Sequence, residues 1–347
     1  MAKKRTISAE SLRPRRALKT LHYEMQGDWY RDPWGWPELD WLVSDGKEHL
    51  RQRLRSDGIR RVAKVDVPKE NFGIRPAIVM DPVDRLIYQC LVDRYSLPLV
   101  GDLRPWVYGW RLPPKNPKGG KWSHNSIQDA EFRNTISFSS NLRTAALRTD
   151  VSSFFASIDL PSLCEAIGDR CGPGPLVERL FDLMRGWGGV AGRRGLAQRS
   201  TASAALANMF LQPLDDVLDG FLRDHNPPRA EISSRFGRRL GDVSLARWMD
   251  DVWIFSRQPA DLRNLQVRMQ AVLNEIGLDL NSAKTELLEG EEVAKAAKRI
   301  QHSAIDGELN HETEPGSTQL DELIEQILEN PSESTRSSIK FATKRMR

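Results

Sequence analysis

Cysteine is scarce in this chain of 347 residues, which contains only Cys90, Cys164 and Cys171. An odd number of cysteines without the paired spacing of zinc ligands argues against a disulfide framework and a zinc site, and it indicates a reducing compartment. Long apolar runs are also missing: no stretch reaches the length of a membrane span, and no apolar segment follows the basic N-terminus. We therefore expect a cytoplasmic protein that does not bind membranes.

The chain also lacks a strong excess of one charge, because 51 Lys and Arg stand against 47 Asp and Glu, a formal net charge of +4. Composition alone therefore does not predict nucleic-acid binding. The basic residues are clustered, and such clusters can bind phosphates by releasing counterions. A solvated tail and helix face would show the same pattern. The clusters comprise Lys3, Lys4, Arg5, Arg13, Arg15, Arg16 and Lys19, and then Arg51, Arg53, Arg55, Arg60, Arg61 and Lys64.

Two adjacent aspartates, Asp250 and Asp251, interrupt the apolar run 245–255. The flanking residues suit β-strands and Asp tolerates tight turns, so the run predicts a hairpin whose tip presents two carboxylates. Burying adjacent carboxylates is costly unless a cation neutralises them. Their oxygen atoms suit a hard divalent ion, which we expect to be Mg²⁺, with Mn²⁺ as a substitute. A surface turn with two solvated acids is the alternative.

A third carboxylate, Asp150, lies at the end of another strand-like segment. Ser152 or Ser153 can start a turn or helix directly after it. Three acids from two strand ends could hold two metal ions roughly 3.5–4 Å apart, which is the spacing used for in-line phosphoryl displacement. The pattern therefore indicates phosphoryl-transfer chemistry, provided that the two strands are neighbours.

These acids belong to an ordered set of motifs that resembles the reverse transcriptase family. Residues 248–251 resemble its aromatic-x-Asp-Asp signature, and Asp150 with its followers resembles its first palm motif. The set runs in family order from about residue 70 to 290, so it is far more specific than any one match. The other matches are the fingers motif at 72–76 and 84–89, the aromatic-Gly-x-Arg element at 108–111, the Gly-Leu-Pro-Gln-Gly…Ser…Leu-Ala-Asn segment at 195–211, and the Leu…Asn-x-x-Lys-Thr motif at 278–285.

The resemblance implies an α+β fold of the right-hand polymerase type, with fingers and a palm whose antiparallel sheet packs on helices. We expect a basic N-terminal segment at 1–20, fingers and N-terminal region at 21–140, a palm with the catalytic motifs at 141–290, and a short helical, thumb-like region at 291–347. Independently of the resemblance, apolar spacing predicts an amphipathic helix over 258–277. Polar composition predicts a linker over 301–318, followed by a short helix over 319–329.

The resemblance also implies roles in catalysis. Asp150 and Asp250 would be the principal metal ligands, and Asp251 would assist more loosely. The backbone carbonyl of Val151 could add an oxygen to the nucleotide-bound ion. Lys284 resembles the lysine that protonates the departing pyrophosphate, where a cation also offsets developing charge. A lone lysine in a loop is usually solvated surface, so its role depends on the motif.

Candidate contacts to the nucleotide triphosphate are Arg75 and Arg85, because guanidinium binds phosphate oxygens through two parallel hydrogen bonds. Arg85 could equally be the structural partner of Asp81 or Asp84, so Arg75 is preferred. Gln198 and the small residues after it resemble the start of a helix beneath the templating base pair; the alternative is an ordinary tightly packed helix.

Further candidates lie near the sugar and the primer. Phe155 falls where the family places a bulky ring that excludes the ribose 2′-hydroxyl; the alternative is a core residue. Trp248 and Met249 fall where relatives contact the primer terminus. Three positions of the motifs depart from the family pattern. Trp248 replaces Tyr, Arg199 replaces Gly next to the nucleotide or template, and Ala197 replaces Pro. A primer-grip element after residue 290 is also lacking.

The resulting hypothesis is an RNA-directed DNA polymerase, a nucleotidyltransferase that uses an RNA template and deoxynucleoside triphosphates to make DNA. The compact chain, basic N-terminus and altered motif resemble the unknown-group and abortive-infection reverse transcriptases of bacterial antiphage defence. That resemblance implies antiviral defence with a dedicated noncoding RNA, and a homo-oligomer or partner defence protein. One alternative is a template-independent or protein-primed deoxynucleotidyl transferase, which a template-blocking Arg199 would favour. The other is an RNA-binding scaffold subunit with a vestigial polymerase site, against which the intact acids count.

Overall fold

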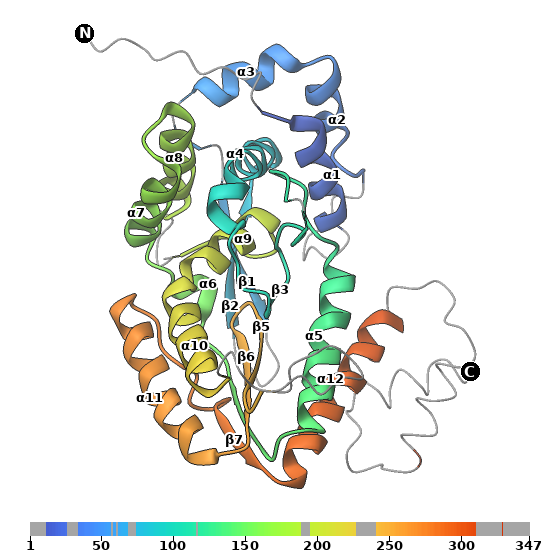
Figure 1. The fold of residues 1–347 in the computed structure, drawn as a ribbon. Coiled ribbons are helices and arrows are strands. Elements are labelled where there is room, and N and C mark those ends of the chain that lie inside the picture. The colour runs from blue at the N-terminus through green and yellow to red at the C-terminus, as the bar shows by residue number, and fades with distance from the viewer. Residues whose placement is uncertain are drawn as a thin grey trace.

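The computed structural model describes residues 12–25, 34–56, 58–59, 62–68, 74–115, 117–188, 195–226, 241–309 and 328. The described chain is a mixture of helices and strands, as expected of an α+β protein. Helices dominate one end of the elongated molecule, and a sheet covered by helices forms the other (Figure 1). No helix among the described residues is long and apolar enough to cross a membrane.

Helix α4 (Pro82–Val100) is the centre of the helical end (Figure 1). The side chain of Asp81 caps its N-terminus by accepting the backbone N–H of Val83 at 2.9 Å, and Pro82 occupies the first turn. Apolar residues occur on all sides of α4, as expected of a helix that is buried all round. Its neighbours are α1 (Pro14–Met25), α2 (Pro37–Ser44), α7 (Leu160–Cys171), α8 (Pro175–Gly188) and α9 (Thr201–Phe210).

Strands β1 (Val62–Pro68) and β2 (Ile74–Met80) form a separate antiparallel pair in which Val62 lies opposite Met80. Helix α3 (Lys47–Arg55) packs against α2. It is also joined to α4 by an ion pair between Arg53 and Asp84, with 2.7 Å between Nη2 and Oδ1. This pair is well buried and fixes the first helices of the chain to the central one.

The second sheet has five strands in the order β3-β5-β6-β4-β7. All of its pairs are antiparallel except β3–β5, which is parallel, so the predicted antiparallel sheet is right for four strands and wrong for its edge. In this exception the two-residue β3 aligns Tyr108 with Trp248. The strands are β3 (Val107–Tyr108), β4 (Ala145–Thr149), β5 (Ser244–Trp248), β6 (Asp251–Ser256) and β7 (Glu286–Glu289).

Helices cover both faces of this sheet, because its central strands are apolar on both sides. Alternate residues of β6 point to opposite faces, so Val252 and Ile254 join the main core while Trp253 and Phe255 join a second cluster. Helices α10 (Gln212–His225) and α11 (Pro259–Glu275) lie beside one face (Figure 1). Helices α5 (Asn125–Ser140) and α12 (Glu291–Leu309) lie beside the other (Figure 1).

Several local expectations can be compared with these elements. The helix predicted over 258–277 is confirmed as α11. The predicted linker at 301–318 is wrong in its first part, because α12 continues through Leu309 before the Pro-Gly break at 315–316. The rest of that linker, the helix expected over 319–329 apart from its residue 328, and the basic residues 1–11 lie outside the described residues.

Candidate active site

The acidic pair lies at the tip of the predicted hairpin. Trp248 of β5 pairs with Asp251 of β6, so Met249 and Asp250 form a two-residue connection. Met249 has φ of 56°, a left-handed conformation that two-residue hairpins require at their first position but that non-glycine residues rarely adopt. The turn therefore places Asp250 at the tip and Asp251 at the start of the following strand.

Asp150 comes to the same end of the sheet. Strand β4 pairs antiparallel with β6, and the last aligned residues are Thr149 and Val252. Asp150 follows directly and is thus in register with Asp251. The condition set by the sequence, that the two strands must be neighbours, is met.

The three carboxylates affect one another electrostatically. The pKa of Asp250 is raised to about 7, first by loss of hydration on burial and then by the charge and hydrogen bonding of Asp150. The pKa of Asp251 is raised to about 6 by burial and by Asp150, although the positive charge of Arg148 opposes the rise. Three ionised carboxylates this close together repel one another, and a bound divalent cation would relieve that repulsion.

A short bridge brings the lysine motif to Asp150. Val151 pairs with Leu280 in an isolated antiparallel bridge, which aligns the chain before Lys284 with the end of β4. The ammonium Nζ of Lys284 lies 2.7 Å from Oδ2 of Asp150, and Nδ2 of Asn281 donates to the same oxygen at 3.2 Å. The side chain of Lys284 remains 63% exposed, so it faces the solvent side of the acids.

The donor atoms suit the expected metal. Among the described residues, no group of three or more His, Cys, Asp or Glu side chains is already arranged to hold an ion. The chemistry nevertheless fits, because Asp150, Asp250 and Asp251 supply the hard oxygen ligands that Mg²⁺ prefers. The bridge beside them uses the carbonyls of Asp150 and Asp279, and it does not use that of Val151. The acids therefore provide suitable ligands while the ammonium of Lys284 still lies against Asp150.

Phe155 lies in the short helix α6 (Phe154–Ser157), five residues after Asp150. Phe154 is 3% exposed and belongs to the core, while Phe155 is half-buried, so the core assignment fits Phe154. Both residues are helical, and their rings lie 5.4 Å apart in an edge-to-face arrangement. The backbone of Phe155 also contacts the turn before α9, because its carbonyl accepts the N–H of Leu196 at 2.8 Å. The backbone of Phe155 is therefore held against the turn that precedes α9.

The turn that precedes α9 requires a glycine at its start. Gly195 has φ of +84°, and a Cβ at this position would lie 2.1 Å from the carbonyl oxygen of Phe155. No side chain can be accommodated at that distance. The glycine of the sequence motif therefore allows close contact between the turn and the residues after Asp150.

Arg85 is a structural residue in this arrangement. Its Nη2 lies 2.9 Å from Oε2 of Glu24 and donates to the carbonyl of Arg199 at 2.6 Å. Glu24 uses its other oxygen to accept the backbone N–H of Thr201 at 2.5 Å, at the start of α9. The sequence had offered Asp81 or Asp84 as the structural partner of Arg85. It did not indicate Glu24, because α1 and α4 are far apart in sequence. Contact between Arg85 and a triphosphate stays a prediction.

The remaining nucleotide candidates are only partly defined. Arg75 lies in β2, and its side chain lies outside the described residues. Gln198 is half-buried and Arg199 is exposed, both in the turn before α9. Arg199 has φ of 59°, so the backbone is left-handed at the position where the motif that the sequence resembles has glycine, which adopts this conformation without strain.

The primer candidates are packed at the hairpin. The ring of Trp248 lies 5.5 Å from that of Trp110 and 5.9 Å from that of Phe132. Gly109 faces the Trp248 ring so closely that a Cβ would lie 3.3 Å from it. Met249 is only 4% exposed. Contacts with Trp110, Phe132 and Gly109 therefore hold the ring of Trp248 in place next to the acidic turn.

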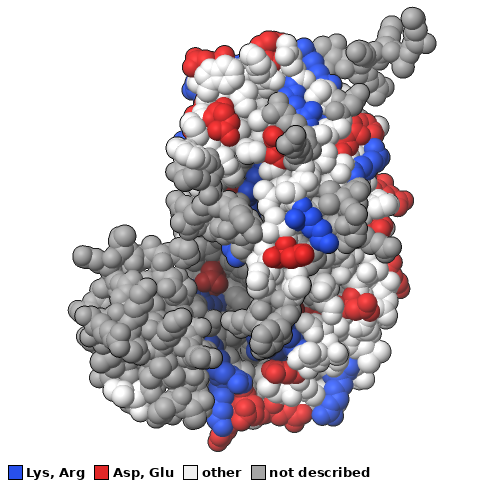
Figure 2. Space-filling view, turned by 180° about the vertical axis from the view of Figure 1, so that it is seen from behind, with Lys and Arg blue, Asp and Glu red and all other residues white. Residues whose placement is uncertain are grey.

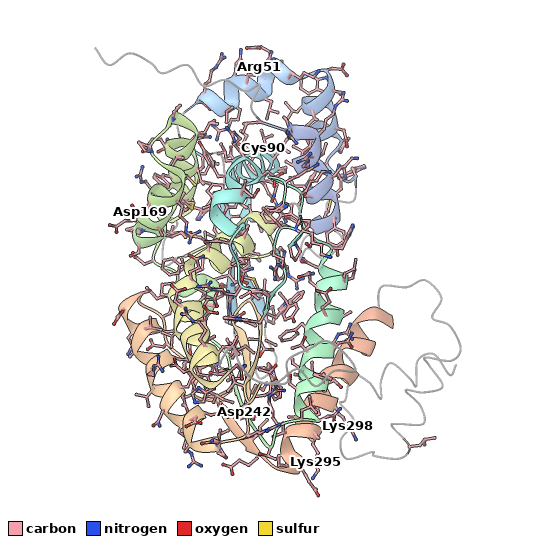
Figure 3. The ribbon with its side chains drawn as sticks, in the orientation of Figure 1. Arg51, Cys90, Asp169, Asp242, Lys295 and Lys298 are labelled. Carbon is pink, nitrogen blue, oxygen red and sulfur yellow. The ribbon has the colours of Figure 1, made fainter. Side chains whose placement is uncertain are left out.

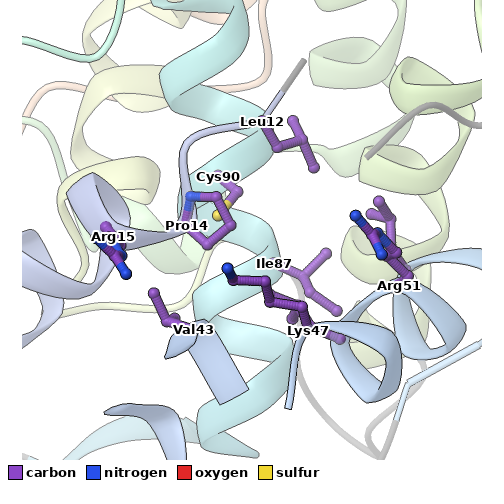
Figure 4. A pocket seen from close by; sticks show the side chains of 10 residues that line it. Leu12, Pro14, Arg15, Val43, Lys47, Arg51, Ile87 and Cys90 are labelled. Atoms are coloured by element: carbon purple, nitrogen blue, oxygen red, sulfur yellow. The ribbon is translucent and has the colours of Figure 1, made fainter. Parts of the chain in front are cut away.

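A cavity of about 250 Å³ lies elsewhere, between the first helices and α4 (Figure 4). It contains none of the predicted site residues. The cavity is lined by Leu12, Pro14, Arg15, Val43, Lys47, Leu50, Arg51, Leu54, Ile87 and Cys90.

A separate hollow is seen from the opposite side to Figure 1. It lies at mid-height of the molecule, and both acidic and basic side chains are visible inside it (Figure 2).

Comparison with known proteins gives an independent assignment. No curated protein matches the chain. Residues 67–340 match the family described as Reverse transcriptase (RNA-dependent DNA polymerase). The match includes all three acids, the turn before α9 and the lysine motif, and it spans most of the 347 residues. The chain therefore belongs to the reverse transcriptase family and is an RNA-directed DNA polymerase with the palm and fingers fold of these nucleotidyltransferases.

Proposed function

We propose that this protein copies RNA into DNA at a site formed by Asp150, Asp250 and Asp251, with two Mg²⁺ ions. The observation that carries the proposal is the convergence of Asp150 with the hairpin acids at one end of the sheet. Burial, and then the charge of Asp150, raise the pKa of Asp250 to about 7. Mutually repelling carboxylates of this kind suit a site that binds divalent cations. Bound ions would activate the attacking primer hydroxyl and stabilise the leaving pyrophosphate.

The chain's own residues have separate tasks in this proposal. Asp150 and Asp250 are the principal ligands, Asp251 assists, and the carbonyl of Val151 adds an oxygen. Lys284 gives a proton to the departing pyrophosphate, for which its exposed ammonium beside Asp150 is well placed. The position of this lysine next to a metal ligand supports the assignment more strongly than the motif alone.

Nucleotide and primer selection involve the residues around the acids. Phe155 excludes the ribose 2′-hydroxyl, and its half-buried ring five residues after the first acid supports that role. Gln198 and Arg199 contact the nucleotide or template, and Arg75 binds the triphosphate. Arg85 acts mainly through the turn that it holds. Trp248 and Met249 contribute the hairpin surface beside the primer terminus.

The biological setting proposed is cytoplasmic antiviral defence in bacteria, with a dedicated noncoding RNA as template and DNA as product. Support comes from Arg199, which stands where the motif that the sequence resembles has glycine. The exposed Arg199 also gives a reason to test untemplated synthesis. A homo-oligomer or partner defence protein belongs to the same proposal.

Incorporation of labelled deoxynucleotides tests the proposal. The purified protein and its co-purifying nucleic acid are incubated with and without RNase, and RNase-sensitive synthesis is expected. RNase-resistant tailing would instead indicate a template-independent or protein-primed transferase. Lack of incorporation by folded protein would leave the scaffold alternative.

Asp250→Asn should abolish synthesis, whereas Asp242→Asn should not. Asp242 precedes β5 at the opposite end of the sheet from the acids and is 59% exposed (Figure 3). Persistent synthesis in Asp250→Asn would refute the metal assignment. Equal loss in Asp242→Asn would show that the effect is not specific to the acidic site.

A further inference from the structure

Arg247 lies fully buried beneath the acidic hairpin. Its Nε and Nη2 donate to the two carboxylate oxygens of Asp215 at 2.7 and 2.6 Å. The exposed fraction of the side chain is 0% for Arg247 and 2% for Asp215. The pKa of Asp215 is raised by burial and lowered by the charge of Arg247, with a net rise above its ordinary value. A charged pair has thus been placed entirely inside the core, between β5 and α10.

The third edge of the same guanidinium reaches the catalytic turn. Nη1 of Arg247 donates to the carbonyl of Met249 at 2.8 Å and to Oδ1 of Asn208 at 3.0 Å. Met249 is the left-handed residue that immediately precedes Asp250. The arginine therefore holds the peptide that sets the direction of the next residue, the acid at the hairpin tip.

Asn208 of α9 extends this network to a second part of the site. Its Nδ2 donates to the carbonyl of Gly109 at 3.0 Å, and Gly109 lies against the ring of Trp248. The backbone N–H of Arg247 is also fixed, because it donates to the carbonyl of Trp106 at 2.9 Å. The hairpin base is consequently held from α9, α10 and the chain before β3.

Stability alone does not account for this arrangement. A buried ion pair is often replaced by apolar residues of similar volume without loss of stability, whereas removing one partner is strongly destabilising. An apolar pair could fill the same space but could not donate to the Met249 carbonyl. The distinguishing contribution of the charged pair is its hydrogen bond to the turn.

We propose that Arg247, oriented by Asp215 and Asn208, is a positioning residue that fixes the carboxylate of Asp250 for divalent metal binding. Asp215 holds the guanidinium of Arg247 along one edge. The remaining N–H groups of Arg247 then fix the conformation at Met249. This inference rests on the proposed metal site and extends it to residues that do not contact the ions. Outer partners of this kind typically change metal affinity or activity by about 10–100-fold.

The decisive variant replaces the pair together, as Arg247→Met with Asp215→Leu. The matched control is Arg53→Met with Asp84→Leu, which removes another well-buried ion pair far from the hairpin. Both double variants should remain folded, because neither leaves one charge without its partner. Urea unfolding and circular dichroism establish that folding is retained before the site is tested.

Two readouts separate positioning from a merely structural role. Binding of Mn²⁺, measured by electron paramagnetic resonance without nucleotide, should weaken at least about tenfold in the Arg247–Asp215 double variant and remain unchanged in the control. In synthesis, kcat should fall by at least about tenfold while the KM for deoxynucleotide changes much less. Arg247→Lys should not rescue either value, because an ammonium cannot bind Asp215 with two parallel bonds and also reach the turn.

A folded Arg247–Asp215 double variant with wild-type Mn²⁺ affinity and kcat would overturn the inference while leaving the proposed function intact. Wild-type Mn²⁺ binding that is unaffected by Asp250→Asn would overturn the metal site itself. Failure of the wild-type protein to bind Mn²⁺ would overturn both. A double variant that unfolds under conditions in which the control remains folded would also count against the inference, because the pair would then be needed for stability.

Discussion

Asp250→Asn should stabilise the metal-free protein at neutral and alkaline pH even though it abolishes synthesis. In the folded protein the pKa of Asp250 lies near 7, against an ordinary value of 3.8, because the carboxylate loses hydration and lies beside Asp150. This difference in proton affinity corresponds to at most ~4 kcal/mol against the ionised carboxylate. Because the side chain is only half-buried and Asn must also be accommodated, we expect a gain of about 2 kcal/mol in unfolding free energy.

The direction of this pH dependence is set by whether the folded or the unfolded state keeps the proton of Asp250 to higher pH. Since the folded pKa of Asp250 is above that of the unfolded chain, the folded state retains the proton over a wider pH range. The stability from this group is fully present below about pH 4 and is lost as the pH rises through about 7. The gain on Asp250→Asn should therefore be small at pH 4 and largest at pH 8.

Urea unfolding in EDTA at both pH values measures this difference. Asp251→Asn should give a smaller gain, because the pKa of Asp251 is raised only to about 6. The exposed control Asp242→Asn should give a change within about 0.5 kcal/mol. Addition of Mg²⁺ should stabilise the wild-type protein more than Asp250→Asn, because the ion binds the folded acids. Equal or lower stability of Asp250→Asn at pH 8 would refute the electrostatic reasoning.

Three further substitutions test the surroundings of the acids. Gly195→Ala should lose at least ~2 kcal/mol of unfolding free energy because its Cβ meets the Phe155 carbonyl, whereas Gly277→Ala, also at positive φ but in open space, should lose about 1 kcal/mol. Glu24→Gln should lose ~3 kcal/mol by removing a buried partner of Arg85, against at most ~0.5 kcal/mol for the exposed Glu48→Gln; equal losses would contradict the clamp. Phe155→Ala should raise ribonucleotide use relative to deoxynucleotide use at least about tenfold in kcat/KM, and an unchanged ratio would remove it from sugar selection.

The hairpin that carries Asp250 and Asp251 was predictable from the sequence because its signal is local. Strand-like residues around Asp250 and Asp251 indicated the hairpin, and apolar spacing indicated α11. The strands were indicated by residue type and the helix by apolar residues at helical spacing. The convergence of Asp150 with this pair could not be predicted from a local pattern. Only the resemblance to the family, through the order of its motifs, indicated that two distant strands lie side by side.

The supporting contacts were not predictable in the same way. Glu24 and Arg85 are 61 positions apart, and Arg247 and Asp215 are 32 apart. Nothing in the local spacing of a charged residue says which distant carboxylate it will meet in the core. Arg247 belonged to the recognised hairpin segment, yet its sequence neighbours gave no sign that its guanidinium would turn inward. Only the packing of α9 and α10 against β5 makes these pairings visible.

The acidic hairpin depends on this hidden support because its own features oppose its conformation. Met249 is left-handed without being glycine, and Asp250 and Asp251 carry raised pKa values beside Asp150. Without ions, each of these features disfavours the folded turn. The guanidinium of Arg247 supplies a donor where the strained peptide has its carbonyl, and it does so from inside the core, where water cannot compete. The geometry that makes the turn unfavourable for the free chain also keeps the carboxylates together for cation binding. The buried pair of Arg247 and Asp215 stabilises this unfavourable turn in the folded protein.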